Sequence, residues 1–126
     1  MSFLKGRILC ADDNPDTRDL VFAMLESAGY DVVCVGSGAE ALELLEREKF
    51  ALIVLDNWMP ELTGTELTRL IRKSDETTPI LFYSAAAYEG DKQAAFAAGA
   101  QGYLTKPEGI DHLLDEVNRL IDNAVE

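Results

Sequence analysis

The amino-acid sequence predicts an α/β fold in which a five-stranded parallel sheet carries helices on both faces. Three observations lead to this prediction. Five short, almost continuously apolar segments alternate with longer segments whose apolar residues recur at helical spacing. Strands buried on both faces of a parallel sheet carry such uninterrupted apolar runs, and each parallel connection needs a crossover helix. The 126 residues suit one domain with a substantial core.

The first strand is predicted at Arg7–Ala11, and an amphipathic helix follows it. Asn14 is a suitable N-cap for this helix, and Pro15 is well tolerated at its first position, where an N–H would have no intrahelical partner. Apolar side chains recur along one face as far as Gly29, a residue type that commonly ends helices. The second predicted strand is the apolar segment Asp31–Val35.

The next two helices each begin with a possible capping box. Ser37 and Glu40 have the spacing at which a hydroxyl and a carboxylate cap each other's backbone N–H groups, and Thr63 and Glu66 repeat it. Between these helices lies the apolar segment Ala51–Leu55, which is the third predicted strand.

The second half of the chain continues the alternation. Pro79–Tyr83 is the fourth predicted strand, and Glu89–Ala98 is an alanine-rich helix that stops before Gly99. Gly102–Leu104 is a short fifth strand. The last predicted helix has a clear helical period in its apolar residues, which are Ile110, Leu113, Leu114, Val117, Leu120 and Ile121.

Composition and charge restrict the function. The chain carries 23 acidic and 11 basic residues, for a formal net charge of −12. Such a surface repels the phosphates of nucleic acids and of anionic lipids, so we expect neither a nucleic acid nor a membrane as a partner. No apolar run is long enough to span a bilayer and no signal peptide is recognisable, which predicts a cytoplasmic protein. Cys10 and Cys34 lie in apolar strands and are interpreted as buried hydrophobic residues, because no CxxC spacing supports a redox pair.

Carboxylates follow two of the predicted strands. Asp12 and Asp13 come directly after the first strand, and Asp56 follows the third. Ligands of open α/β sheets bind at the carboxyl ends of the strands, so these three groups converge if the two strands are neighbours. A hard divalent cation, Mg²⁺ or Mn²⁺, would relieve their repulsion, although one of the pair could simply cap the following helix. A carboxylate beside such a cation can act as a nucleophile toward a phosphoryl group.

Two further strand ends carry groups that suit phosphoryl chemistry. Ser84 follows the fourth strand and supplies a hydroxyl, and Lys106 follows the fifth and supplies a cation. Together with the acid pair and the lone Asp56, this arrangement resembles the response-regulator receiver domains of two-component signalling. The resemblance covers essentially the whole chain, and no linker or second domain is recognisable, so we expect a single receiver domain over residues 1–126 with no output domain. A stand-alone receiver, a phosphorelay shuttle and a fragment of a longer regulator or hybrid kinase all remain open. The resemblance also implies the flavodoxin-like, doubly wound strand order 2-1-3-4-5.

The resemblance implies a role for each residue of the expected site. Asp56 would accept a phosphoryl group from a phosphohistidine on a histidine kinase or a histidine phosphotransfer protein. Asp13 would bind the metal directly and Asp12 directly or through water. The backbone carbonyl of Trp58 would be a further ligand beside Asp56. Lys106 would contact the phosphoryl group.

The resemblance also implies a switch. Ser84 would bind the phosphoryl group after transfer, and Tyr103 stands where the family has an aromatic residue that turns inward in response. Pro107 would follow a cis peptide bond from Lys106. The affected surface would be the fourth helix, fifth strand and fifth helix, through which a downstream protein partner binds. The chain would be a monomer or a weak dimer.

Three positions depart from the family pattern or tune it. Glu108 follows the Lys-Pro pair, where the family commonly has an aromatic residue. Trp58 and Ala86 stand at positions that, in this family, set how fast the phosphoryl group is lost. The bulk of Trp58 and the lack of a polar group at Ala86 predict a long-lived phosphorylated state.

Other functions compete with this interpretation. A metal-dependent aspartyl phosphatase would need a second aspartate two residues after the nucleophile, where Trp58 stands. A flavin-binding carrier would need a phosphate-binding loop rich in Ser, Thr or Gly after the first strand, where the chain reads ADDNP. A receiver-like interaction module that takes no phosphoryl group is the remaining alternative.

Overall fold

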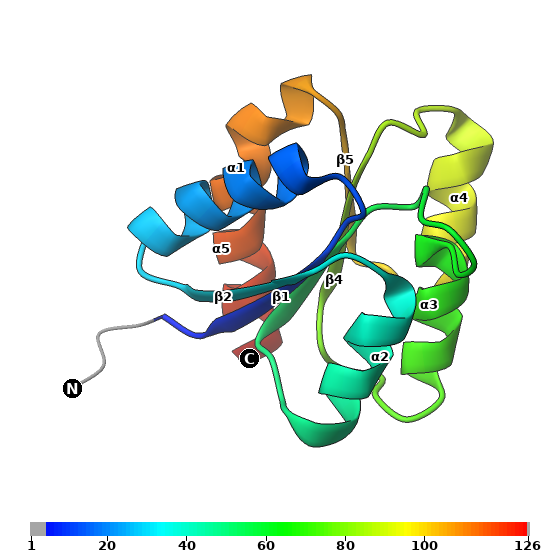
Figure 1. Ribbon diagram of the computed structural model, residues 1–126, viewed down its shortest axis with the longest axis horizontal. Helices are drawn as coiled ribbons and strands as arrows, with labels where there is room; N and C mark the ends of the chain where they lie inside the picture. The colour runs from blue at the N-terminus through cyan, green and yellow to red at the C-terminus, as the bar shows by residue number, and fades with distance from the viewer. Residues whose placement is uncertain (1–4, 126) are drawn as a thin grey trace.

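The computed structural model describes residues 5–125, so residues 1–4 and 126 of the predicted domain lie outside the described residues (Figure 1). Strands and helices alternate in the predicted order. No helix in the described range is long and apolar enough to cross a membrane. The elements are β1 (Arg7–Ala11), α1 (Pro15–Ser27), β2 (Asp31–Val35), α2 (Gly38–Arg47), β3 (Leu52–Leu55), α3 (Gly64–Arg72), β4 (Ile80–Ser84), α4 (Glu89–Ala98), β5 (Gly102–Thr105), the 3₁₀ helix η1 (Glu108–His112) and α5 (Leu113–Val125).

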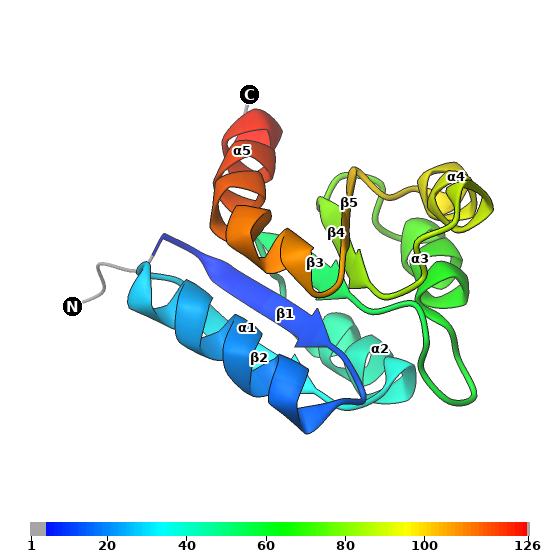
Figure 2. The ribbon, with the colours of Figure 1, turned by 90° about the horizontal axis from the view of Figure 1, so that it is seen from above.

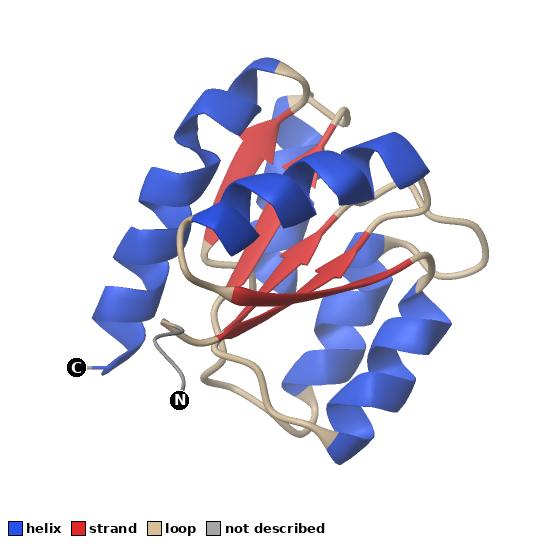
Figure 3. Cartoon of the chain, turned by 60° about the vertical axis from the view of Figure 1, so that its left-hand side comes forward, coloured by secondary structure: helices blue, strands red, loops and turns tan. Residues whose placement is uncertain are grey.

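The five strands form one parallel sheet in the order β2-β1-β3-β4-β5, which confirms the predicted topology. Helices cover both faces of the twisted sheet (Figure 3). Helices α1 and α5 pack on one face, and α2, α3 and α4 pack on the other (Figure 2). The strand order places β1 and β3 side by side in the middle of the sheet, and β2 and β5 at its two edges.

Two hydrophobic cores separate the sheet from its helical layers. Ile8 and Cys10 of β1 point into the core beneath α1 and α5, whereas Leu9 and Ala11 point into the core beneath the other three helices. All four side chains are at most 1% exposed. Burial on both faces therefore explains why the strand segments are apolar without interruption.

Helix starts follow the predicted capping residues. The side chain of Asn14 accepts hydrogen bonds from the N–H groups of Asp16 (2.8 Å) and Thr17 (3.3 Å). Thr63 and Glu66 form a complete capping box, in which each side chain accepts a hydrogen bond from the other residue's backbone N–H. These contacts satisfy donors that the first helical turn leaves unpaired.

Only one of the two hydrogen bonds of the capping box predicted for α2 is present. Ser37 Oγ accepts a hydrogen bond from the Glu40 N–H (3.2 Å), as expected. The Glu40 carboxylate, however, accepts from the N–H of Gly36 (2.8 Å) and not from that of Ser37. The side chain therefore caps the strand-to-helix turn one residue earlier than the motif requires.

The last predicted helix is also divided. Ile110 lies in the 3₁₀ segment Glu108–His112, and α-helical structure begins only at Leu113. The interruption accompanies a close approach, because a Cβ on Gly109 would lie 2.9 Å from that of Leu104. The apolar period predicted one helix, but the chain must first turn tightly against β5.

Arg72, at the end of α3, joins this helix to the loop between α3 and β4 and to the end of α4. Its guanidinium donates hydrogen bonds to the backbone carbonyls of Asp75 (2.9 Å), Thr78 (2.8 Å) and Gly99 (2.9 Å). Gly99 follows α4 and has a φ of +123°, a conformation that side chains rarely allow. One side chain therefore links the C-terminal ends of α3 and α4.

Candidate functional site

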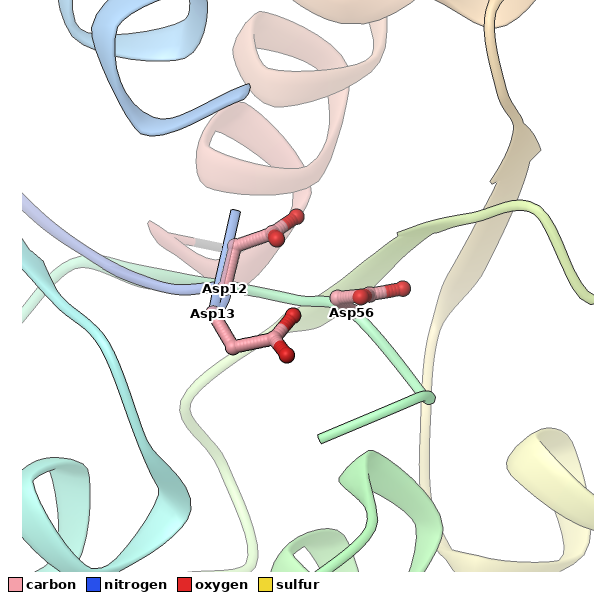
Figure 4. Close-up of side chains that lie close together, drawn as sticks. All are labelled: Asp12, Asp13 and Asp56. Carbon is pink, nitrogen blue, oxygen red and sulfur yellow. The ribbon is translucent and has the colours of Figure 1, made fainter. Parts of the chain in front are cut away.

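Three carboxylates meet at the carboxyl edge of the sheet. The Asp12 N–H donates to Val35 O (3.1 Å) and the Asp56 N–H donates to Ala11 O (3.0 Å), so ladder hydrogen bonds fix both backbones. Carboxylate oxygens of Asp12, Asp13 and Asp56 lie within 4.8 Å of one another (Figure 4). The structure thus brings the sequence-predicted acids into one cluster, because β1 and β3 are neighbours.

The three acids differ in burial and in their hydrogen bonds. Asp12 and Asp56 are 2% and 5% exposed, whereas Asp13 is exposed to solvent. Asp12 Oδ1 accepts a hydrogen bond from the N–H of Asn14 (2.9 Å), so this carboxylate does support the start of α1. The other oxygen of Asp12, Oδ2, pairs with the ammonium group of Lys106. Capping therefore accounts for only one of the two oxygens of this carboxylate.

Lys106 neutralises part of the buried negative charge. Its Nζ lies 2.9 Å from Asp12 Oδ2 and 3.6 Å from Asp56 Oδ2. The residue follows β5, and its peptide bond to Pro107 is cis, the isomer that the sequence resemblance implies. Burial alone lowers the pKa of Lys106, but its bonds to the two carboxylates outweigh burial and raise that pKa above its ordinary value.

The environment of Asp56 favours its neutral form. Burial raises its pKa above the ordinary value, and the negative charge of Asp12 adds to this effect, while Lys106 opposes it. Asp56 Oδ1 is buried and has no hydrogen-bond partner. Buried polar oxygens are normally paired, so this oxygen lacks the partner that a purely structural carboxylate would have.

Ser84 and Tyr103 lie on the β4–β5 side of this cluster. Ser84 is fully buried, and its Oγ accepts hydrogen bonds from the N–H groups of Asn57 (3.4 Å) and Ala86 (3.2 Å). The ring of Tyr103 stacks on Phe82 at 5.5 Å between centroids, and its hydroxyl donates to the carbonyl oxygen of Ala86. Tyr103 is therefore half-buried against Phe82 and contacts the same loop as Ser84.

Trp58 lies on the outside of the site. It is 56% exposed, and it is the single tryptophan of the chain. It comes two residues after Asp56, at the position from which the expected carbonyl ligand would come.

Sequence reasoning missed the residues that support the Asp56 loop. Asn57 is buried, and its side-chain oxygen accepts hydrogen bonds from the N–H (3.0 Å) and hydroxyl (2.9 Å) of Thr65. A Cβ on Gly64 would lie 2.4 Å from the carbonyl oxygen of Asp56, so α3 packs directly on the loop. Arg18 donates to the Asp12 carbonyl oxygen (2.8 Å). The one signal in the sequence for the packing of α3 on this loop is the glycine at position 64, directly after the capping residue Thr63.

Comparison with known proteins identifies the architecture. The profile of the family described as "Response regulator receiver domain" matches residues 8–118, which is most of the chain. The chain belongs to the response-regulator receiver domains. These domains are signalling modules of two-component systems, so the resemblance drawn from the strand-end residues is confirmed at the level of the family.

Individual relatives agree with this assignment. The chain is 48% identical over 102 residues to an uncharacterised 14.6 kDa protein of Leptolyngbya boryana, covering 79% of this chain and 78% of that protein. It is 35% identical to a probable transcriptional regulatory protein of Picosynechococcus, covering 93% of this chain. The chain spans about half the length of this and several other curated relatives, 49% in the Picosynechococcus case.

Solved structures of receiver domains superpose closely. A Francisella response regulator receiver domain has a TM-score of 0.89 at 33% identity, covering 94% of this chain and 98% of that one. The receiver domain of the sensor histidine kinase PA1611 of Pseudomonas aeruginosa has a TM-score of 0.85 at 34% identity, covering 93% and 98%. The latter structure is described with a magnesium ion coordinated in its active-site cleft.

Proposed function

We propose that this receiver domain accepts a phosphoryl group on Asp56 from a phosphohistidine of a histidine kinase or a histidine phosphotransfer protein. One observation carries the proposal: the Asp56 carboxylate is buried, has one oxygen without a hydrogen-bond partner, and faces the Lys106 ammonium on its other oxygen. A carboxylate in a purely structural role would be expected to have both oxygens paired.

The donor set fits magnesium or manganese. Asp12, Asp13 and Asp56 supply only oxygen ligands, which hard divalent cations prefer. One of the Asp56 oxygens, Oδ1, has no hydrogen-bond partner. The exposed Asp13 leaves a side open for water ligands, which magnesium usually keeps. When bound, such an ion would offset the repulsion between these carboxylates and the phosphoryl oxygens. The Trp58 carbonyl is proposed as a further ligand.

Asp56 would be the nucleophile of the transfer. Its ionised carboxylate attacks phosphorus, an oxygen–phosphorus bond forms, and the bond between phosphorus and the histidine nitrogen breaks. Lys106 would hold a phosphoryl oxygen through its ammonium group. Ser84 Oγ already accepts two N–H groups, so its own proton can be directed to another phosphoryl oxygen.

The same contacts link the site to a candidate output surface. Ser84 and the Tyr103 hydroxyl both bond to Ala86, in the loop that leads to α4. A shift of Ser84 toward a phosphoryl group would therefore change the Tyr103 contact and the start of α4. Tyr88, just before α4, is 83% exposed, and Phe96 on α4 is 46% exposed, which suits a protein partner on the α4–β5–α5 face.

Intact-mass spectrometry tests this function directly. The purified chain is incubated with acetyl phosphate and magnesium, while the fluorescence of Trp58 is followed. We expect magnesium to change the fluorescence, and one phosphoryl group to be added only when magnesium is present. The control is Asp56→Asn, which should gain no phosphoryl group.

Two results would contradict the proposal. A mass increase that persists in Asp56→Asn would place the phosphoryl group elsewhere. No mass increase with either acetyl phosphate or a phosphorylated histidine phosphotransfer domain, in protein shown to be folded, would favour the interaction module that takes no phosphoryl group.

A further inference from the structure

Two cysteines that are far apart in the sequence are direct neighbours in the sheet. Strands β1 and β2 pair in parallel with Cys10 opposite Cys34. Both side chains belong to the core beneath α1 and α5, so they project from the same face of the sheet. We propose that Cys10 and Cys34 form a redox site, which a hydroperoxide converts into an intramolecular disulfide.

The spacing of the two strands suits such a bond. Neighbouring strands lie about 4.7–4.9 Å apart. The Cα atoms of disulfide-bonded cysteines are usually about 4.4–6.8 Å apart. Because β2 is an edge strand, its small adjustment toward a disulfide disturbs one hydrogen-bond ladder and not two. A pair at this register therefore falls within the Cα range of disulfides.

The two thiols differ in access, which assigns their order of reaction. Cys10 is 1% exposed, whereas Cys34 is only half-buried. Cys34 Sγ also lies 3.7 Å from the carbonyl oxygen of Arg18. Hydrogen peroxide reaches the more exposed of the two sulfurs first, which is that of Cys34. Cys34 is therefore the attacking group and Cys10 the resolving group.

The chemistry balances with hydrogen peroxide as the oxidant. The Cys34 thiolate attacks one peroxide oxygen, the O–O bond breaks, and the leaving hydroxide takes a proton to become water. Cys34 is now a sulfenic acid. Cys10 sulfur then attacks Cys34 sulfur, an S–S bond forms, the S–O bond breaks, and the hydroxide leaves as water with the Cys10 proton. Two thiols are oxidised and one peroxide is reduced to two waters.

Thiol labelling and mass spectrometry test the site in the full chain. The metal-free protein is treated with hydrogen peroxide at low protein concentration, and the remaining thiols are then alkylated in denaturant. We expect a monomer that has lost two hydrogen atoms and takes up no alkyl group. Reduction with dithiothreitol before alkylation should restore two labelled thiols.

Two single variants distinguish the steps. In Cys34→Ser, Cys10 should remain an alkylatable thiol after peroxide treatment. In Cys10→Ala, Cys34 should accumulate as a sulfenic acid that dimedone traps. Since Cys10 is in the core, the folding of its variant is checked by circular dichroism, and Cys34→Ser carries the test if that variant is unfolded.

Three outcomes would overturn the proposal. The first is over-oxidation of Cys34 in the native chain while Cys10 stays alkylatable. The second is a disulfide between two chains in place of the internal one. The third is two unreacted thiols under conditions in which the urea-unfolded chain forms the disulfide.

Discussion

Replacing Asp56 with asparagine should stabilise the metal-free protein. The substitution nearly keeps the shape of the side chain and removes its charge. In the native structure this carboxylate is 5% exposed, and burial together with the charge of Asp12 raises its pKa. A pKa that is higher in the folded than in the unfolded state means that ionisation of Asp56 costs folding free energy at neutral pH.

The charges around Asp56 set the size of this effect. With an effective dielectric constant of about 20, two like charges separated by 4.8 Å, the outer limit for this cluster, repel by about 3.5 kcal/mol. At 3.6 Å, Lys106 attracts the Asp56 carboxylate by about 4.6 kcal/mol on the same scale. This repulsion and this attraction largely cancel, so the cost of burying the Asp56 charge decides whether the substitution stabilises the protein. We expect a gain of about 1 kcal/mol in the free energy of unfolding, because Lys106 keeps its partner Asp12.

Urea unfolding, followed by circular dichroism in the presence of a chelator, measures this gain. The unfolding midpoint should rise while the denaturant slope stays unchanged. In a thermal scan the same gain corresponds to about 3–6 °C. Asp19→Asn is the matched control, because Asp19 is an exposed aspartate in α1 and the same chemical change there should alter stability little.

The pH dependence follows from the raised pKa of Asp56. Below the unfolded-state pKa, near the ordinary value of 3.8 for an aspartate, both states are protonated and the penalty is absent. The penalty develops as the pH rises through the interval between the unfolded and folded pKa values and is complete above the folded one. The advantage of Asp56→Asn should therefore be larger at pH 8 than at pH 4. A variant that is less stable than the native protein at pH 8 without metal would refute this reasoning.

Three further substitutions probe the surrounding structure. Lys106→Met removes the cation that faces two buried carboxylates, so urea unfolding at neutral pH should show a loss of about 3 kcal/mol, and an unchanged midpoint would contradict the ion-pair assignment. Gly64→Ala would place a methyl group 2.4 Å from the Asp56 carbonyl oxygen and should cost about 2–3 kcal/mol in urea unfolding. Its matched control Gly90→Ala, in an open part of α4, should stabilise by about 0.5–1 kcal/mol, and equal effects would argue against tight packing at position 64. Thr63→Ala removes the capping box of α3 and should lower the thermal midpoint by an amount equivalent to about 1 kcal/mol.

The strands and the acidic cluster were predictable because they depend on local pattern and on one topological rule. Apolar runs locate strands, and parallel strands place their carboxyl ends at one edge. The sequence therefore predicts that three carboxylates lie close together, provided that β1 and β3 are neighbours; these are Asp12, Asp13 and Asp56. Ser84 and Lys106 follow in the same way, since each stands at or just after a strand end.

The contacts that support the site depend on packing between distant elements, which no local pattern records. Nothing near Asn57 in the sequence indicates that Thr65 would bond to its side chain. The closeness of Cys10 and Cys34 depends on the register of β1 against β2, which the packing of the whole sheet sets. The break between η1 and α5 was unpredictable for the same reason. The apolar period continues through Glu108–His112, but this segment must turn tightly against β5.

The Arg72 link has a mechanical consequence for α4. The arginine fixes the carbonyl of Gly99 at the C-terminal end of the helix, whereas the N-terminal end begins beside the exposed Tyr88. If phosphorylation displaces Ser84 as proposed, the movement enters α4 at its N-terminal end, while Arg72 holds the C-terminal end. We therefore expect α4 to rotate about its C-terminal end and not to move along its axis. Amide hydrogen exchange should change most on phosphorylation in the first turn of α4 and least near Ala98, and Arg72→Gln should abolish this gradient.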